Sequence, residues 1–408
     1  MAVGLHPPRN ILPIAGVRLG VAAAGIRYAN RTDLTLIHLA EGSQVAGVFT
    51  RNRFCAAPVL VAQRHLADGS GVRALVINTG NANAGTGAAG LQAAEASCQV
   101  VAGQLGCAQE AVLPFSTGVI GEPVALAEKI AGVLPSCIET LAEDHWEVAA
   151  AAIMTTDTIA KACSRQLEMD GVTVTVTGMA KGSGMIRPDM ATMLAYIATD
   201  APLHGAALQQ CLQEAMERSF NRITVDGDTS TNDACILMAT GQAVLPPISL
   251  ATDPRYGRLR DAITAVAQWL AQAVVRDGEG ATKFIPIHVL GGRDAAECLQ
   301  VAYRMAHSPL IKTAFFASDP NWGRLLAAIG SAGVDDLEVD GVQVWLGDTR
   351  IVRDGARDRD YDEAAGQAVM AQEEIPVRVD LGRGAAEAQI WTCDLSYDYV
   401  RINADYRS

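Results

Sequence analysis

Two segments with the residue pattern of β-strands flank a glycine-rich stretch in the middle of the chain. Residues 172–177 read Val-Thr-Val-Thr-Val-Thr, an alternation that predicts a half-buried strand. The apolar run 193–197 predicts a second strand, and the Gly-Ser-Gly turn at 182–184 lies between the two. Thr192 stands where the second strand begins. A break in the chain before Thr192 would therefore not separate two domains.

Helix-like and strand-like segments alternate along the rest of the chain, so we expect a compact layered α/β protein with mixed sheets. Apolar residues recur at spacings of three and four in 258–276, a predicted helix that stops at Asp277-Gly278. Residues 123–134, 206–220 and 294–306 have similar patterns. We predict strands within 337–353 and 375–391, joined by turns at Asp340-Gly341, Gly347-Asp348 and Gly382-Arg383-Gly384. The length of 408 residues suggests two or three domains or layers.

Composition and charge exclude several classes of protein. Half of the residues are hydrophobic and 19% are charged, which predicts a large packed core rather than disorder. The net charge of −13 argues against binding to nucleic acid or to an anionic membrane surface, and leaves small anionic substrates open. The nine cysteines are scattered, without the spacing of metal ligands, and we see neither a signal peptide nor a membrane-spanning run. We therefore expect a cytoplasmic protein without a bound metal.

Two small polar segments interrupt apolar runs. Residues 78–85 follow a predicted strand, and their Asn and Gly residues tolerate left-handed backbone. Residues 116–121 contain small side chains that let a backbone N–H approach a reacting carbonyl oxygen, as an oxyanion hole requires. Each segment also fits an ordinary structural connection, and the residues alone leave both interpretations open.

Further polar segments carry carboxylates and hydroxyls. Residues 154–158 fit the end of a helix followed by a turn. Residues 223–233 fit either a magnesium or calcium site or a hydrogen-bonded loop, although their spacing is not that of an EF-hand. Glu279 lies between two glycines and is either an exposed loop carboxylate or the partner of a substrate ammonium group. Residues 318–324 predict a turn and a helix start, and a tail such as 401–408 is frayed by default.

Taken in order, these segments resemble the ornithine acetyltransferases of arginine biosynthesis, also called bifunctional glutamate N-acetyltransferases. The matching stretches cover nearly the whole chain: 48–58, 78–87, 116–121, 155–158, 181–194, 220–233, 278–283, 318–324 and the C-terminal tail. The resemblance implies a layered mixed-sheet α/β sandwich of a type shared with certain aminopeptidases. It also implies self-cleavage between Ala191 and Thr192 into an α chain, 1–191, and a β chain, 192–408. Both chains would share one interwoven fold, and the usual assembly has two copies of each.

The resemblance also implies a role for each matching residue. Thr192 would be the nucleophile, with its own new α-amine as the base, and Thr117 and Gly118 would form the oxyanion hole. The contacts of the amino-acid substrate would be Thr155, Lys181, Thr192, Glu279, Asn403 and Ser408. The acetyl group of N-acetylornithine would pass to Thr192 and then to glutamate, in ping-pong order and without a metal or organic cofactor. Arg187 and Asp189 depart from the residues usual beside the cut.

Two alternatives to this function stay open at the level of sequence. An N-terminal-threonine amidase or aminopeptidase of the same architecture would hand the acyl group to water rather than to glutamate. A non-catalytic amino-acid-binding regulator would need neither Thr192 nor cleavage. No residue decides whether acetyl-CoA also serves as a co-substrate.

Overall fold

The computed structural model describes residues 2–123, 125–187 and 193–405. The chain divides into two compact units. The larger unit consists of residues 7–221 and 228–274, and the smaller unit consists of the described residues of 1–6, 222–227 and 275–408. The predicted cleavage point, Ala191 and Thr192, lies outside the described residues, as do Asp189 and Ser408.

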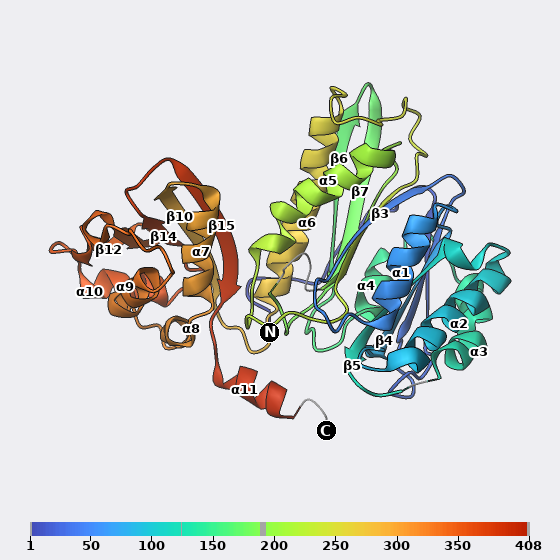
Figure 1. The fold of residues 1–408 in the computed structure, drawn as a ribbon, viewed down its shortest axis with the longest axis horizontal. Coiled ribbons are helices and arrows are strands. Elements are labelled where there is room, and N and C mark those ends of the chain that lie inside the picture. Colours follow the sequence, from blue (N-terminus) through green and yellow to red (C-terminus); the bar gives the residue numbers. More distant parts are fainter. Residues whose placement is uncertain (1, 124, 188–192, 406–408) are drawn as a thin grey trace. The chain divides into compact units, whose positions relative to one another are not determined.

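The larger unit is a sandwich of two mixed sheets (Figure 1). Within these sheets, β4 (Ala74–Asn81) pairs in parallel with β5 (Val112–Val119), and β8 (Leu194–Thr199) pairs in parallel with β9 (Ala234–Ala239). The other neighbouring strands are antiparallel. The first sheet has the order β1 (Val17–Ala22), β2 (Leu34–Leu39), β4 (Ala74–Asn81) and β5 (Val112–Val119). The second has the order β3 (Gln44–Phe49), β9 (Ala234–Ala239), β8 (Leu194–Thr199), β7 (Val172–Lys181) and β6 (Lys161–Met169).

Apolar side chains from both sheets fill the space between them. Leu75 and Phe115 of the first sheet and Tyr196 and Ile236 of the second belong to one buried cluster. The rings of Phe115 and Tyr196 meet edge to face, with centroids 5.4 Å apart. Such inward-facing residues alternate with outward-facing ones along each strand, as the pleat of a strand requires.

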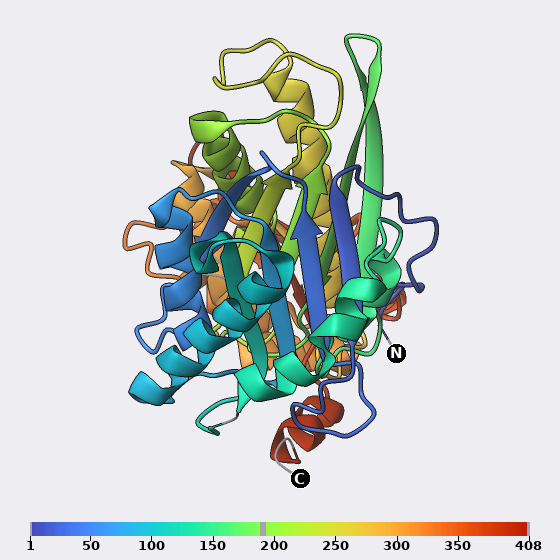
Figure 2. The ribbon, with the colours of Figure 1, turned by 90° about the vertical axis from the view of Figure 1, so that its right-hand side faces the viewer.

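Helices cover the outer faces of the sandwich. The first sheet is covered by α1 (Ala57–Asp68), α2 (Gly87–Leu105) and α3 (Leu126–Glu139), which lie in front of its strands in Figure 2. The other helices of this unit are α4 (Trp146–Ala152), α5 (Gly205–Glu217) and α6 (Tyr256–Arg276), with short 3-10 turns at Gln109–Ala111 and Phe220–Arg222. The helix predicted at 258–276 is confirmed, whereas the one predicted at 123–134 begins and ends later.

The predicted strand pair around the glycine-rich stretch is confirmed, and the first strand of the pair is longer than the Val-Thr repeat. Strand β7 extends past the Val-Thr repeat to Lys181, and β8 begins at Leu194, directly beside it. Strand β8 also pairs with β9, and β9 pairs with β3. The two strands that follow the predicted cleavage point, β8 and β9, therefore lie between strands that precede it in one sheet.

The smaller unit has one mixed sheet. Its order is β13 (Ala356–Arg357), β12 (Thr349–Arg353), β11 (Gln343–Leu346), β14 (Val377–Asp380), β10 (Phe284–Gly292) and β15 (Ala386–Cys393). Its helices are α7 (Ala295–Ala306), α8 (Pro309–Phe316), α9 (Trp322–Gly330), α10 (Glu363–Met370) and α11 (Tyr397–Ala404), with a 3-10 turn at Val339–Gly341. Apolar faces of α7, α8 and α9 pack against the sheet in one cluster.

One turn in this unit does not form a hairpin. Residues 382–384 do connect two strands, β14 and β15, as predicted. However, β10 lies between those strands, in parallel with β14 and antiparallel to β15. The turn is therefore a crossover past β10, which local residue preferences cannot distinguish from a hairpin.

Among the described residues, no helix has the length and apolarity that a membrane crossing requires.

Candidate active site

Three of the predicted site residues of the larger unit come together where β5 and β7 end. Thr117 and Gly118 are near the end of β5, and Lys181 is the last residue of β7. The Nζ atom of Lys181 donates a hydrogen bond of 3.3 Å to Oγ1 of Thr117. Lys181 also pairs in register with Leu194, two residues after Thr192 in the sequence. The structure thus joins the predicted oxyanion-hole segment to the residues next to the predicted cut.

Gly118 has a conformation that few other residues adopt. Its φ is +134°, and a Cβ added there would lie 2.3 Å from the carbonyl carbon of Gly80 and 2.5 Å from the nitrogen of Asn81. Only glycine allows β4 and β5 to approach so closely at this point. The two strands pair in parallel here, with Thr79 opposite Thr117 and Gly80 opposite Gly118.

A buried carboxylate, Asp157, connects a further predicted position, Thr155, to the backbone next to Lys181. Its Oδ2 atom accepts the N–H of Thr155 at 3.0 Å, and its Oδ1 atom accepts the N–H of Gly182, next to Lys181, at 2.7 Å. Oδ1 also forms an ion pair of 2.7 Å with Nζ of Lys161, and both side chains are almost completely buried. One side chain therefore fixes the backbone at Thr155 and the backbone that follows β7.

The charge of Asp157 is sustained by its neighbours. Burial alone would raise the pKa of this carboxyl group, but the ammonium groups of Lys161 and Lys181 and hydrogen bonds from Lys161 and Thr155 lower it below its usual value. Asp157 is thus an ionised carboxylate that holds cations and N–H donors in place. This arrangement is a way to orient a site, and it leaves little capacity for proton transfer.

The polar segment before β9 is a hydrogen-bonded loop. The side-chain amide of Asn232 donates to the carbonyls of Ala82 (2.6 Å) and Ser116 (2.9 Å). The hydroxyl of Thr50 donates to the carbonyl of Ser230 at 2.8 Å. The loop therefore ties the second sheet to the strand that carries Thr117. Within the described part of the chain, no group of three or more His, Cys, Asp or Glu residues could hold a metal ion.

The smaller unit brings together two other predicted positions, Glu279 and Asn403. The side-chain amide of Asn403, on α11, donates to Oε2 of Glu279 at 2.8 Å. Glu279 is 8% exposed, and its loop is fixed by Asp394, which accepts both backbone N–H groups of Thr282 and Lys283. The described part of the tail is therefore helical and bonded to the Glu279 loop, rather than frayed.

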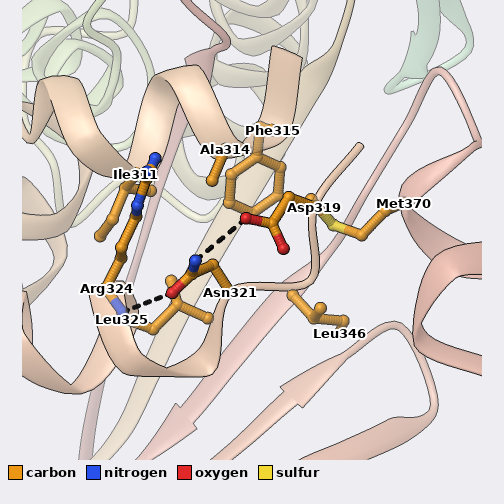
Figure 3. Close-up of a pocket in the computed structure, with 9 residues that line it drawn as sticks. All are labelled: Ile311, Ala314, Phe315, Asp319, Asn321, Arg324, Leu325, Leu346 and Met370. Atoms are coloured by element: carbon orange, nitrogen blue, oxygen red, sulfur yellow. Dashed lines mark hydrogen bonds between the residues drawn. The ribbon is translucent and has the colours of Figure 1, made fainter. Parts of the chain in front are cut away.

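The motif at 318–324 is separate from this pair. It forms a turn and the start of α9, as predicted, because the Asn321 side chain accepts the N–H of Arg324 and caps the helix. Asn321 also donates to Asp319, and both bonds lie beside a small hollow lined by Phe315 and Met370 among others (Figure 3). The polar groups at its mouth bond to one another, so these contacts indicate a structural role.

Some features of the site had no recognisable signal in the sequence. Asp157 belongs to the segment 154–158, in which only Thr155 was assigned a role at the site. Lys161 begins a strand with its ammonium buried, and nothing in the residue pattern distinguishes it from a surface lysine. The Ala191–Thr192 bond and Ser408, by contrast, are predictions that lie outside the described residues.

Comparison with known proteins gives one consistent family. Residues 18–408 match the model of the ArgJ family. The arginine biosynthesis bifunctional protein ArgJ of Pseudomonas fluorescens (strain Pf0-1) is 55% identical over 408 residues, which cover all of both chains.

Two solved structures are also similar. The arginine biosynthesis bifunctional protein ArgJ of Bacillus halodurans is 36% identical with a TM-score of 0.50, and the match covers 52% of this chain and 99% of that chain. An ornithine acetyltransferase of Mycobacterium tuberculosis, complexed with ornithine, is 35% identical with a TM-score of 0.38, and the match covers 44% of this chain and 94% of that chain. The family match and the full-length identity establish that this chain belongs to the ArgJ family.

Proposed function

We propose that this protein transfers the acetyl group of N-acetylornithine to glutamate in arginine biosynthesis, through an acetyl ester on Thr192. Self-cleavage between Ala191 and Thr192 would first release the α-amine of Thr192. The observation that carries the proposal is the hydrogen bond between Lys181 and Thr117, which joins the predicted oxyanion-hole segment to the strand beside Leu194. The 55% identity to a bifunctional ArgJ protein over its whole length supports the same reaction.

Cleavage is supported by the lengths of the matching chains. Nearly the whole solved chain from B. halodurans corresponds to only 52% of this chain, so that chain is about half as long. The P. fluorescens protein, in contrast, matches this chain from end to end. Self-cleavage would explain why one family contains both full-length sequences and a solved chain of about half that length.

The chemistry follows from the groups that cleavage would create. A chain-terminal α-amine has a pKa of about 8, so part of it is neutral near pH 7 and can accept the proton of the Thr192 hydroxyl. As Oγ attacks the acetyl carbonyl, donors at Thr117 and Gly118 would stabilise the oxyanion. Ornithine leaves with the proton, and the acetyl ester remains. The amine of glutamate then attacks the ester, which gives ping-pong kinetics.

The finer assignments are part of the same proposal. Thr155 and Lys181, and in the smaller unit Glu279 and Asn403, keep the substrate-contact roles that the resemblance implies, and so does Ser408. We also propose an assembly of two α and two β chains in the cytoplasm, which agrees with nine cysteines that are all free. The reaction as written needs no cofactor, and acetyl-CoA is a candidate second donor because the P. fluorescens relative is called bifunctional.

The test begins with the mass and N-terminal sequence of the purified protein. We expect two polypeptides, one of which begins at Thr192, and acetylglutamate as the product of N-acetylornithine and glutamate. Thr192→Ala should remain a single chain without transfer activity, whereas Thr192→Ser should still cleave because it keeps a hydroxyl. Rapid transfer by Thr192→Ala would overturn the proposal.

Two further outcomes would favour the alternatives. Free acetate in place of acetylglutamate would indicate an amidase, in which water accepts the acyl group. An intact chain that binds amino acids without turnover would indicate a regulator. An assay with acetyl-CoA as the sole donor decides separately whether the enzyme has the second activity.

A further inference from the structure

Asp233 lies beside the strand that follows the predicted cleavage point. Leu194, the first residue of β8, pairs in register with Ala234, the first residue of β9. The N–H of Ala234 also donates to the carbonyl of Met193 at 2.9 Å. Asp233 directly precedes Ala234, and Met193 would be the second residue of the β chain. Thr192, whose α-amine cleavage would release, is the residue before Met193 in the sequence.

The side chain of Asp233 is buried and incompletely bonded. Asp233 is 3% exposed, and its Oδ2 atom has no hydrogen-bond partner among the described residues. A buried polar atom without a partner destabilises a fold, because it has lost water without gaining a hydrogen bond. Oδ2 is therefore an acceptor position that the described residues do not fill.

Hydrogen bonds hold the backbone around Asp233 in place. Its carbonyl accepts the N–H of Thr50 at 2.9 Å, and the neighbouring Asn232 is bonded to the carbonyls of Ala82 and Ser116. The loop is thus fixed on both sides of the carboxyl group.

The charged and titratable neighbours of Asp233 are few. Burial raises the pKa of its carboxyl group well above the usual value, whereas Ser230 and the ammonium group of Lys181 lower it only in part. The thiol of Cys55 is close enough for Asp233 to raise its pKa, after the larger effect of burial. In the uncut chain these surroundings favour the neutral form of the Asp233 carboxyl group, and a new cation beside it would favour the ionised form.

We propose that Asp233 is a positioning residue for the nucleophile, and that its carboxylate receives the α-ammonium group of Thr192 after cleavage. This inference rests on the cleavage in the proposed function. When Oγ of Thr192 attacks the acetyl carbon, the hydroxyl proton moves to the α-amine and the Asp233 carboxylate pairs with the resulting ammonium group. When the carbon–nitrogen bond of N-acetylornithine breaks, that proton leaves on the amine of ornithine. Asp233 orients the amine and does not itself touch the substrate.

The experiment compares Asp233→Asn with Asp200→Asn in the cleaved enzyme. Asp200 follows the last residue of β8, and burial raises the pKa of its carboxyl group as well. Because β8 and β9 are parallel and Asp233 precedes β9, the two variants make the same chemical change at opposite ends of this strand pair. For each protein we would titrate the Thr192 α-amine by its rate of chemical labelling against pH, and measure kcat and KM for acetyl transfer.

We expect Asp233→Asn to fold and cleave, because a neutral amide replaces a neutral acid of the same shape. Loss of the carboxylate should lower the pKa of the α-amine, so the acid limb of the pH–rate profile moves to lower pH. The kcat for transfer should fall by about tenfold or more, with KM changed by less than about threefold, because ground-state contacts of the substrate remain. Asp200→Asn should match the unsubstituted enzyme in all three measurements.

The conservative variant Asp233→Glu keeps the test decisive if Asp233→Asn does not mature. It retains a carboxylate displaced by one methylene, and it should move the α-amine titration part of the way in the same direction. An α-amine titration that is the same in the unsubstituted enzyme and in the Asp233 variants would overturn the inference, and so would an equal change in Asp200→Asn. If the unsubstituted protein does not cleave, the proposed function fails first. If it cleaves and transfers acetyl groups, but the pKa of the Thr192 α-amine does not change in the Asp233 variants, only this inference fails.

Discussion

At the scale of single residues, Gly118 is a position where the backbone tolerates little change. A Cβ there would collide with the backbone of the neighbouring strand at Gly80 and Asn81. Gly118→Ala should therefore force β4 and β5 apart at the predicted oxyanion hole. We expect kcat to fall about 100-fold or more, the usual effect of losing one oxyanion donor. Steady-state kinetics check this, with Gly103→Ala as the control, because a Cβ at Gly103 in α2 meets nothing within 4 Å.

Two buried carboxyl groups of the larger unit, those of Asp157 and Asp233, should affect stability with opposite dependence on pH. Asp157 has a lowered pKa, so its contribution is present above the unfolded-state pKa of about 3.9 and is lost as the pH falls through the lower value of the folded state. Asp233 has a raised pKa, so the folded uncut chain holds a proton that the unfolded chain releases above about pH 3.9. Asp233 therefore destabilises the uncut fold increasingly as the pH rises.

This difference can be measured in the uncut Thr192→Ala protein by denaturant unfolding at pH 3 and pH 7. Adding Asp157→Asn should lower the free energy of unfolding at pH 7 by about 3 kcal/mol or more, because the buried ammonium group of Lys161 loses this carboxylate. The loss should be smaller at pH 3. Adding Asp233→Asn should raise the free energy of unfolding at pH 7 and change it little at pH 3. A loss at pH 7 from Asp233→Asn would contradict the assignment of a neutral acid.

At this scale, a site residue could be predicted when the residues that indicate it lie close together in the sequence. The residues around the predicted cut are recognisable because glycines, a lysine and a threonine follow one another in a single segment. The roles of Asp157 and Asp233 depend on Lys161, Lys181 and strand register. Lys161 lies only four residues after Asp157, but the burial of this pair depends on the packing of the fold around it. The contacts of Asp157 and Asp233 with Lys181 join separate segments of the chain, which no local spacing reports.

At the scale of elements, the tail helix and the Glu279 loop act as one piece. Ser396 caps α11 by accepting the N–H of Tyr399, and its hydroxyl also donates to the carbonyl of Gly280 at 2.6 Å. Gly280 has a φ of +70°, and a Cβ there would lie 2.5 Å from the nitrogen of Tyr399. The cap and the close approach of the glycine together hold Asn403 against Glu279.

Ser396→Ala should release this contact. We expect it to remove about 1 kcal/mol from α11, the typical value of a helix cap, and to make the tail more sensitive to limited proteolysis. If Asn403 and Glu279 bind substrate as proposed, KM for N-acetylornithine should rise while cleavage is unaffected. Asp362→Ala is the matched control, because Asp362 caps α10 and has no hydrogen bond to the Glu279 loop in the described structure. An equal rise of KM in both variants would argue against the link.

Helices and strands with a regular spacing of apolar residues could be predicted from the sequence, but the elements that they pack or pair with could not. The spacing of apolar residues identified α6 and α7, and the Val-Thr alternation identified β7. The sequence could not show that β10 lies between β14 and β15, because strand order depends on contacts between residues far apart in the chain.

At the scale of the whole molecule, the predicted cut falls within one sheet. Strands β3 and β7 precede the cut, β8 and β9 follow it, and β9 pairs with β3 as β8 pairs with β7. We therefore expect the two products, about 20 and 23 kDa in proportion to their lengths out of 42.8 kDa, to elute together from a sizing column. Denaturing electrophoresis should separate them. Two products that elute apart without denaturant would contradict this sheet order.

The burial of β8 and β9 also bears on how such a protein can be made. All six residues of each strand are buried, although both would belong to the second polypeptide and β3 and β7 to the first. If the second polypeptide were made alone, β8 and β9 would lack the strands that pair with them, and their unpaired edges would be prone to aggregation. Maturation must therefore come late in biosynthesis, and a gene divided at this point would need both halves translated side by side.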